Sequence, residues 1–101
     1  MKDETVYSWI FLSIATASQL ESVKIKSIID IADGINHALP TQNELNQSIT
    51  WLIKQDLISK NDKKYKLTVK GKDAYIKAEN GQTTYFSIWK KLEKKFANCI
   101  D

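Results

Sequence analysis

The chain has 101 residues, is 43% hydrophobic and 10% aromatic, and carries a net charge of +3 from 15 lysines, no arginine and 12 acidic residues. This length and apolar content fit one globular domain with a modest core and exclude a disordered segment. The longest uncharged stretch, residues 6–20, is too short and too polar to span a membrane, and residues 1–4 lack the basic start of a signal peptide, so we expect a cytoplasmic protein that does not bind a membrane.

The first predicted element is a helix over about residues 4–18. A helix that is apolar all round is buried on more than one side. In a chain this short, we expect a partner chain to cover one of those sides. The apolar residues that surround the helix are Val6, Tyr7, Trp9, Ile10, Phe11, Leu12, Ile14 and Ala15.

The next segment predicts a short strand and a second helix. Residues 22–25 alternate apolar and polar side chains, as a strand does. Ser27, with Asp30 three residues later, predicts the helix start, because a hydroxyl caps a helix amide and an acidic side chain favours the N-terminal end. This helix should continue to about His37 and bury Ile28, Ala32 and Ile35.

A third helix is predicted after Pro40, which cannot continue the preceding one. Thr41 and Glu44 form a T-x-x-E capping box directly ahead of an apolar period. The helix should end near residues 55–56 and pack against the apolar face of the second helix. Its expected buried residues are Leu45, Ile49, Leu52 and Ile53.

A hairpin follows the third helix. Its first strand is predicted to begin at residues 57–58, and residues 60–64 form a polar five-residue turn. Residues 65–67 return as the second strand, with side chains that alternate between its two faces.

Two further helices complete the chain. Thr68 caps a short helix that runs through Ala78, and residues 80–81 end it. Thr83 or Thr84 opens the last helix, whose opposite face is rich in lysine. The apolar stripe of this helix is Tyr85, Ile88, Trp89, Leu92 and Phe96.

The predicted fold is therefore mainly α with a small β-hairpin, and residues 28–71 resemble the winged helix-turn-helix family. The matching text is Pro40-Thr41-x-x-Glu44-Leu45, Ile49-x-x-Leu52, Leu57-Ile58 and Tyr65-x-Leu67-Thr68-x-x-Gly71. The last of these patterns is common in MarR-like and PadR-like regulators. The resemblance implies one winged-helix domain over residues 1–101, with an N-terminal helix at about 1–20, a core at 22–78 and a C-terminal helix at 83–101. The flanking helices resemble the dimerisation helices of those regulators, which implies a homodimer.

The resemblance also implies a DNA-binding transcriptional regulator whose third helix enters the major groove of double-stranded DNA. Amide side chains pair bidentately with the edge of adenine, so an exposed face rich in them is chemically suited to reading bases. An ordinary solvated helix face uses the same residue types. The base-facing residues would be Gln42, Asn43, Asn46, Gln47 and Thr50, which lie off the apolar stripe and should be exposed.

The hairpin would be the wing that lies along the phosphate backbone. Residues 51–101 hold twelve lysines and six acidic residues, whereas residues 1–50 hold three lysines and six acidic residues, so the positive charge gathers in the C-terminal half. Lysine binds phosphate as a point charge and needs little geometric precision. The phosphate-binding residues would be Lys54, Lys60, Lys63, Lys64 and Lys66.

Several features leave an alternative open, a winged-helix protein-interaction module without DNA affinity. The chain lacks arginine, the commonest specific reader of guanine. Asp30 and Asp33 make the second helix acidic, and Asp62 at the wing would repel a phosphate.

The residues of the chain suggest no catalytic site, metal site or cofactor, and we expect a protein that is not an enzyme. His37 and Cys99 are the only histidine and cysteine, and no ligand spacing suggests zinc. A third hypothesis is a regulator whose terminal helices frame a hydrophobic effector pocket lined by tryptophans, although core packing is the more ordinary role for Trp9, Trp51 and Trp89.

Overall fold

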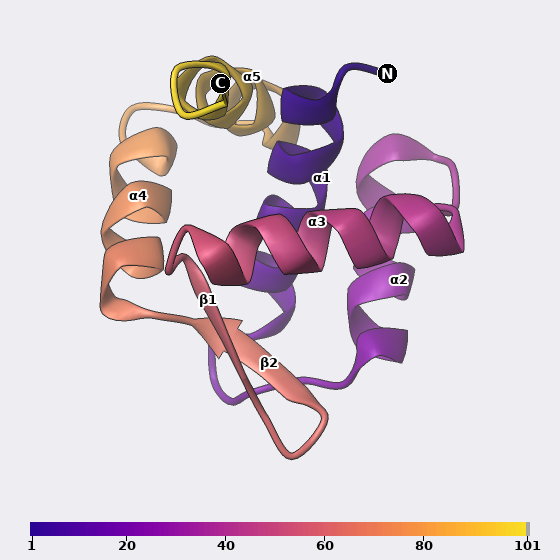
Figure 1. The fold of residues 1–101 in the computed structure, drawn as a ribbon. Coiled ribbons are helices and arrows are strands. Elements are labelled where there is room, and N and C mark those ends of the chain that lie inside the picture. Colours follow the sequence, from indigo (N-terminus) through magenta and orange to yellow (C-terminus); the bar gives the residue numbers. More distant parts are fainter. Residues whose placement is uncertain (101) are drawn as a thin grey trace.

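The computed structural model describes residues 1–100, which form five helices and one antiparallel two-stranded hairpin. Figure 1 shows α1 passing through the middle of the molecule, α3 crossing in front of it, and α2 and α4 on opposite sides. α5 lies across the top and the hairpin projects at the bottom. The fold class is mainly α with a small β-hairpin, as predicted. The elements are α1 (Asp3–Ala17), α2 (Ile25–Asn36), α3 (Gln42–Lys54), β1 (Ile58–Asn61), β2 (Lys64–Leu67), α4 (Val69–Glu79) and α5 (Tyr85–Ala97).

α1 is the central helix of the core, and nine of its 15 residues are buried. α2, α3 and α5 all pack against it. Ser8 and Ser13 are buried too, but their hydroxyls donate to carbonyl oxygens of Glu4 and Trp9 in the same helix, at 2.7 and 2.8 Å, so their burial leaves no donor unpaired. Burial on more than one side is confirmed. The expected cover by a partner is not needed, because helices of the same chain supply it.

The aromatic residues of the terminal helices join this core. The ring of Phe96 on α5 lies edge-on to Phe11, with centroids 5.4 Å apart. The indole N–H of Trp9 donates to the carbonyl oxygen of Ala32 at 2.9 Å, and that of Trp89 donates to the carbonyl oxygen of Thr5 at 3.0 Å. These bonds satisfy the polar edge of each ring where it is covered. The apolar surface that predicted a dimer is thus mostly used within one chain.

α2 begins three residues earlier than predicted. Lys24 is its N-cap and Ser27 lies inside the first turn, so Ser27 does not cap the helix. Val23 exchanges two backbone hydrogen bonds with Tyr65, of 2.9 and 2.7 Å, and the predicted strand is reduced to this single bridge. Because only Val23 takes part in the bridge, the extended segment ends there and α2 begins at Ile25. Ile28 and Ala32 are buried as predicted, while Ile35 is half-buried.

α3 has the predicted capping box. The Glu44 amide donates to the Thr41 hydroxyl oxygen at 3.0 Å, and the Thr41 amide donates to the Glu44 carboxylate at 2.9 Å. Leu45, Ile49 and Leu52 are buried as predicted, but Ile53 is 42% exposed. The packing partner also differs from the prediction, because the closest backbone approaches of α3 are to α1 and β1, not to α2. The all-round apolar α1 is instead the main neighbour of both helices.

The hairpin is tighter than predicted. β1 continues to Asn61 and β2 begins at Lys64, so a two-residue turn replaces the expected five-residue one. Asp62 and Lys63 in this turn have φ of 52° and 64°. Two successive positive φ values are typical of the type I′ turn, whose twist matches that of the two strands. The register pairs Ile58 with Leu67, Ser59 with Lys66, Lys60 with Tyr65 and Asn61 with Lys64.

This turn predicts that Lys63→Gly stabilises the protein. The left-handed conformation destabilises a residue that has a Cβ by about 1–2 kcal/mol. Glycine avoids this cost, but it loses more conformational entropy on folding, which offsets about 0.5–1 kcal/mol of the gain. We therefore expect the free energy of unfolding to rise by about 0.5–1 kcal/mol, measured by urea unfolding. Lys64→Gly, one residue further in β2, is the control and should destabilise the protein. A lower urea midpoint for Lys63→Gly would contradict the turn geometry.

Hydroxyl caps start the last two helices as predicted. The Thr68 hydroxyl oxygen accepts from the amide of Gly71 at 3.0 Å. Thr84, one of the two residues considered, caps α5 by accepting from the amide of Ser87 at 3.2 Å. Gly81 adopts φ 76° between the two helices, a conformation that glycine supplies without steric cost.

No helix within residues 1–100 has both the length and the apolar composition needed to cross a membrane.

Candidate nucleic-acid interface

The exposed face of α3 carries the five residues predicted to read bases. Gln42, Asn43, Asn46, Gln47 and Thr50 are all exposed, which confirms that part of the prediction. The capping box fixes the N-terminal turn of the helix that holds the first two. The Gln42 amide donates to the Asn46 amide oxygen at 3.1 Å, so these two side chains lie together one turn apart.

The hairpin divides its lysines between two faces. Successive side chains of a strand point to opposite faces. Lys60 shares a face with its partner Tyr65, and its ammonium lies 5.7 Å from the centroid of that ring. Lys64 and Lys66 have the other parity and point away from this face. The lysines predicted as one phosphate-binding set therefore do not form one surface, because the two-residue turn fixes a parity that a flexible loop would have left open.

An open groove of about 550 Å³ separates α3 from the hairpin. Three of the predicted base-facing residues and two of the predicted lysines line it, and its floor is apolar. None of the lining residues carries a carboxylate, so the groove presents amide, hydroxyl and ammonium groups. Its lining residues are Ile25, Gln42, Asn46, Ile49, Thr50, Ile53, Lys60, Lys63 and Tyr65.

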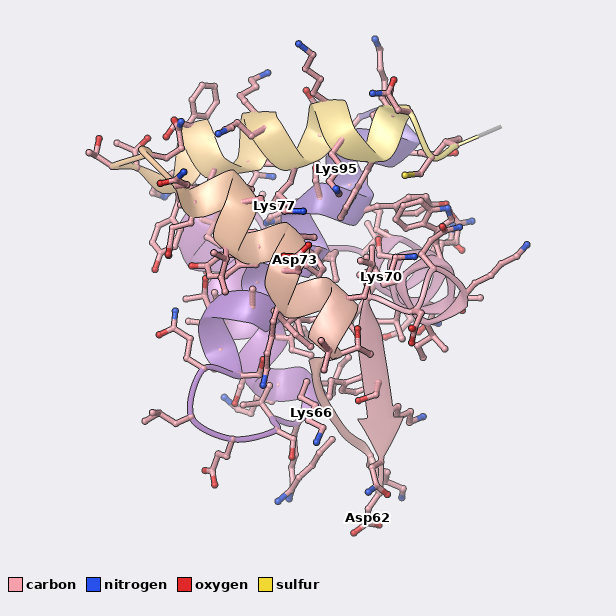
Figure 2. The ribbon with its side chains drawn as sticks, turned by 90° about the vertical axis from the view of Figure 1, so that its left-hand side faces the viewer. Asp62, Lys66, Lys70, Asp73, Lys77 and Lys95 are labelled. Atoms are coloured by element: carbon pink, nitrogen blue, oxygen red, sulfur yellow. The ribbon has the colours of Figure 1, made fainter. Side chains whose placement is uncertain are left out.

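Other predicted residues lie outside the groove. Asn43 and Gln47 are exposed elsewhere on α3, and Lys54 is exposed at its C-terminal end. Lys64 and Lys66 line a separate depression of about 230 Å³ together with Asp62. Figure 2 shows Asp62 at the tip of the hairpin, with Lys66 nearer to the body of the molecule. The carboxylate expected to repel a phosphate is thus not among the residues that line the groove.

The acidic residues of α2 and α3 are likewise absent from the groove lining. Asp30 forms an exposed ion pair with Lys26, at 3.2 Å between the ammonium nitrogen and a carboxylate oxygen. Glu44 is engaged in the capping box, and Asp33 is exposed on α2. The groove therefore keeps its positive character although the N-terminal half of the chain is acidic.

Sequence reasoning missed the apolar floor of the groove. Ile53 follows Ile49 by four residues, and this helical spacing placed it in the core. The hairpin does not cover Ile53 at the last turn of α3, so this side chain lines the groove and is not part of the core. Only the position of the hairpin reveals this, and that position depends on contacts distant in sequence.

The structure also bears on the hypotheses of an effector pocket and of a metal site. Trp51 stacks on Tyr7, with centroids 4.8 Å apart, and Trp9 stacks on Trp89 at 6.2 Å, so the tryptophans contribute to packing. Trp89 also lines a depression of about 70 Å³ between the terminal helices. Within residues 1–100, no three His, Cys, Asp or Glu side chains gather as a metal ion would require. A polar depression lies at the α4–α5 junction, where burial, followed by a hydrogen bond to Glu79, raises the pKa of Tyr75 to about 12.

Comparison of the chain with protein-family models, with curated proteins and with solved structures finds no match. The geometry of the groove is therefore the basis for a functional proposal.

Proposed function

We propose that the protein is a winged-helix, DNA-binding transcriptional regulator, in which α3 enters the major groove and the hairpin contacts phosphates. The observation that carries the proposal is the groove, where Gln42 and Asn46 of α3 face Lys60 and Lys63 of the hairpin without an intervening carboxylate. Amides recognise the adenine edge, and lysines bind the phosphates beside it. Such a regulator would act on double-stranded DNA in the cytoplasm.

The dimensions of α3 support this role. The major groove is about 12 Å wide and admits an α-helix. At about 1.5 Å per residue, the 13 residues of α3 span about 20 Å. Regulators of the helix-turn-helix kind contact bases through the N-terminal residues of this helix, and Gln42 and Asn43 are its first two residues here. The positive end of the helix dipole lies at the same turn and favours the approach of a phosphate.

The hairpin is held at a defined angle to α3. The Val23–Tyr65 bridge ties β2 to the segment between α1 and α2, while the first residue of β1, Ile58, is buried in the core. A wing fixed at its base presents its lysines to a duplex at little cost in conformational entropy. This arrangement supports the winged-helix assignment.

The hairpin lysines provide the first test. We expect Lys60→Gln with Lys63→Gln to weaken binding to mixed-sequence duplex DNA at low salt and to reduce the slope of log K against log salt by about 0.9 for each lost phosphate contact. The measurement is fluorescence anisotropy at several salt concentrations. Lys64→Gln with Lys66→Gln removes the same charge from the other face of the same hairpin and should leave the slope nearly unchanged.

Asn46→Ala tests base reading. It should weaken binding to a duplex selected from a random pool by about 1–3 kcal/mol and leave mixed-sequence binding unchanged. Failure of the wild-type protein to bind any duplex at low salt would overturn the proposal. Equal losses from the two lysine pairs would overturn the placement of DNA in the groove.

A protein-interaction module is the second candidate, and the apolar floor of the groove favours it. Ile53 is 42% exposed there, beside Ile49 and Tyr65, and suits an apolar side chain of a peptide. If the protein is such a module, the wild type should bind duplex DNA negligibly even at low salt, and neither pair of lysine substitutions should change that binding.

A homodimer through the terminal helices remains part of the proposal, but the apolar surface available for it is smaller than the sequence predicted. Tyr85 of the apolar stripe and its neighbour Phe86 are 48% and 64% exposed, whereas Trp89 is partly buried and Ile88, Leu92 and Phe96 are buried. Sedimentation equilibrium at high micromolar concentration should show a dimer that Phe86→Ser weakens, because a buried phenyl ring contributes to association. A monomer at that concentration rejects this part of the proposal.

A further inference from the structure

The outer face of α5 carries exposed lysines. Lys90, Lys91 and Lys94 lie along it and Lys95 is exposed beside it, on the side of α5 that faces α4 in Figure 2, while Ile88, Leu92 and Phe96 are buried in the core. The one acidic residue of the helix, Glu93, is partly buried and accepts a hydrogen bond from the Thr5 hydroxyl. Only Lys90 approaches this carboxylate, at 3.7 Å.

The lysines of α5 are arranged so that they repel one another. Lys90 and Lys94, and likewise Lys91 and Lys95, are four residues apart, where like charges disfavour a helix. Two exposed lysines of other helices have acidic partners at this spacing, Lys26 with Asp30 and Lys77 with Asp73, whereas Lys54, Lys70 and Lys72 form no ion pair within the described part of the chain. Among residues 1–100, no carboxylate lies within 4.0 Å of the ammonium groups of Lys91, Lys94 and Lys95. The negative end of the helix dipole relieves part of this repulsion, and an anionic partner would relieve more.

This surface lies at the opposite end of the molecule from the groove. Figures 1 and 2 view the molecule at right angles to each other, and in both α5 is at the top and the hairpin at the bottom. Figure 2 also shows Lys77 of α4 on the same side as Lys95, where it forms an ion pair with Asp73. The molecule measures 32 × 29 × 27 Å, so a duplex in the groove and a second polyanion on α5 would be separated by the thickness of the domain.

We propose that the outer face of α5 is a second, sequence-independent binding surface for duplex DNA, so that one protein molecule bridges two duplexes. The bridging rests on the proposed function of the groove. Lysines supply contacts to phosphate without reading bases, and this face, with Lys95 beside it, offers four of them. A small apolar depression of about 70 Å³ lies at its edge, lined by Thr5, Phe86, Trp89, Lys90 and Glu93. A membrane surface fits less well, because Ile88, Leu92 and Phe96 of α5 are buried in the core and only the first turn, at Tyr85 and Phe86, exposes apolar side chains.

The test is capture of a second duplex. A duplex immobilised on beads is incubated at low salt with the protein and then with a fluorescent mixed-sequence duplex, and the retained fluorescence is measured. The wild-type protein should retain the second duplex. The variant Lys91→Gln/Lys94→Gln/Lys95→Gln should retain at least about tenfold less of it, because three phosphate contacts disappear. The same variant should keep wild-type affinity for a selected duplex that depends on Asn46.

The matched control removes three lysines elsewhere. Lys2→Gln/Lys24→Gln/Lys26→Gln has the same net charge as the α5 variant, and all three positions are exposed and outside both surfaces. It should capture the second duplex nearly as the wild type does. Thermal unfolding of each variant verifies that the fold is retained, as expected for glutamine at exposed positions.

Three outcomes overturn the inference. The first is capture by the α5 variant equal to that of the wild type, which would mean that bridging uses two grooves of a dimer. The second is an equal loss of second-duplex capture in the control variant, which would show that the effect depends on net charge and not on the face of α5. The third is lysine-dependent binding of α5 to vesicles containing phosphatidylserine without capture of DNA. Failure of the proposed function is separate, because it would appear as unchanged duplex binding by Lys60→Gln with Lys63→Gln.

Discussion

Gly71→Ala is expected to destabilise the protein by about 3–5 kcal/mol, through overpacking and the loss of a hydrogen bond. A Cβ built at Gly71 lies 1.9 Å from the carbonyl oxygen of Leu57 and 2.9 Å from its carbonyl carbon. Both are backbone atoms, so no rotamer change relieves the clash. The same Leu57 oxygen accepts a hydrogen bond from the Thr68 amide at 3.1 Å, and moving α4 away would break this bond as well.

Thermal unfolding measures the effect. For a domain of this size, each kcal/mol lowers Tm by about 4–8 °C, so the loss should exceed about 12 °C. Gly34→Ala is the matched control, since a Cβ there meets no atom within 4 Å and the residue is exposed within α2. That variant should gain about 0.5–1 kcal/mol, because alanine favours a helix interior. A Gly71→Ala protein as stable as the wild type would show that α4 does not pack on Leu57 as described.

The local signals in the sequence predicted the starts of α3, α4 and α5, with Thr84 as one of two candidates, whereas Ser27 does not cap α2 as expected. Thr41, Thr68 and Thr84 each cap a helix with a hydroxyl, and all three were identified because a cap depends on residues two or three positions away. The pattern around Gly71 was recognised too, but its reason was not visible. That reason is the approach of α4 to Leu57, which lies 14 residues earlier in the chain.

The arrangement of the helices was predicted less well. Apolar spacing identified the buried residues of α3 but not their neighbour, because any apolar helix satisfies the same spacing. The all-round apolar α1 was expected to need a partner chain, whereas α2, α3 and α5 of the same chain cover it. Composition alone does not show how much surface a short chain is able to bury once one helix occupies the centre.

The candidate site was predicted in part for a similar reason. The exposed residues of α3 followed from helical periodicity, which is local. The faces of the hairpin lysines depended on the turn length, since shifting a strand by one residue moves every side chain to the other face. Asp62 and Lys63 adopt positive φ without glycine, so the usual sequence signal of a two-residue turn was missing.

Phe96→Ala is expected to cost about 3–5 kcal/mol, the usual range for a buried phenylalanine. Phe96 is fully buried, and its ring lies 5.4 Å from that of Phe11 and 5.1 Å from that of Trp51. It therefore joins α5 to α1 and α3 at once, and its removal leaves a cavity that three helices would have to close. Ile76→Ala on α4 is the control for stability, since that side chain is 61% exposed and should cost less than about 0.5 kcal/mol.

The same variant distinguishes a core within one chain from a core shared between two chains. If Phe96 packs within its own chain, the loss in free energy of unfolding is the same at low and at high protein concentration. If α5 instead covered α1 of a partner, Phe96→Ala would weaken the dimer itself and so change how Tm depends on protein concentration. Urea and thermal unfolding at low and high micromolar concentrations separate the two cases. A loss below about 1 kcal/mol, or one that grows on dilution, would mean that α5 does not close the core of its own chain, because a fully buried phenylalanine in a packed core costs more to truncate.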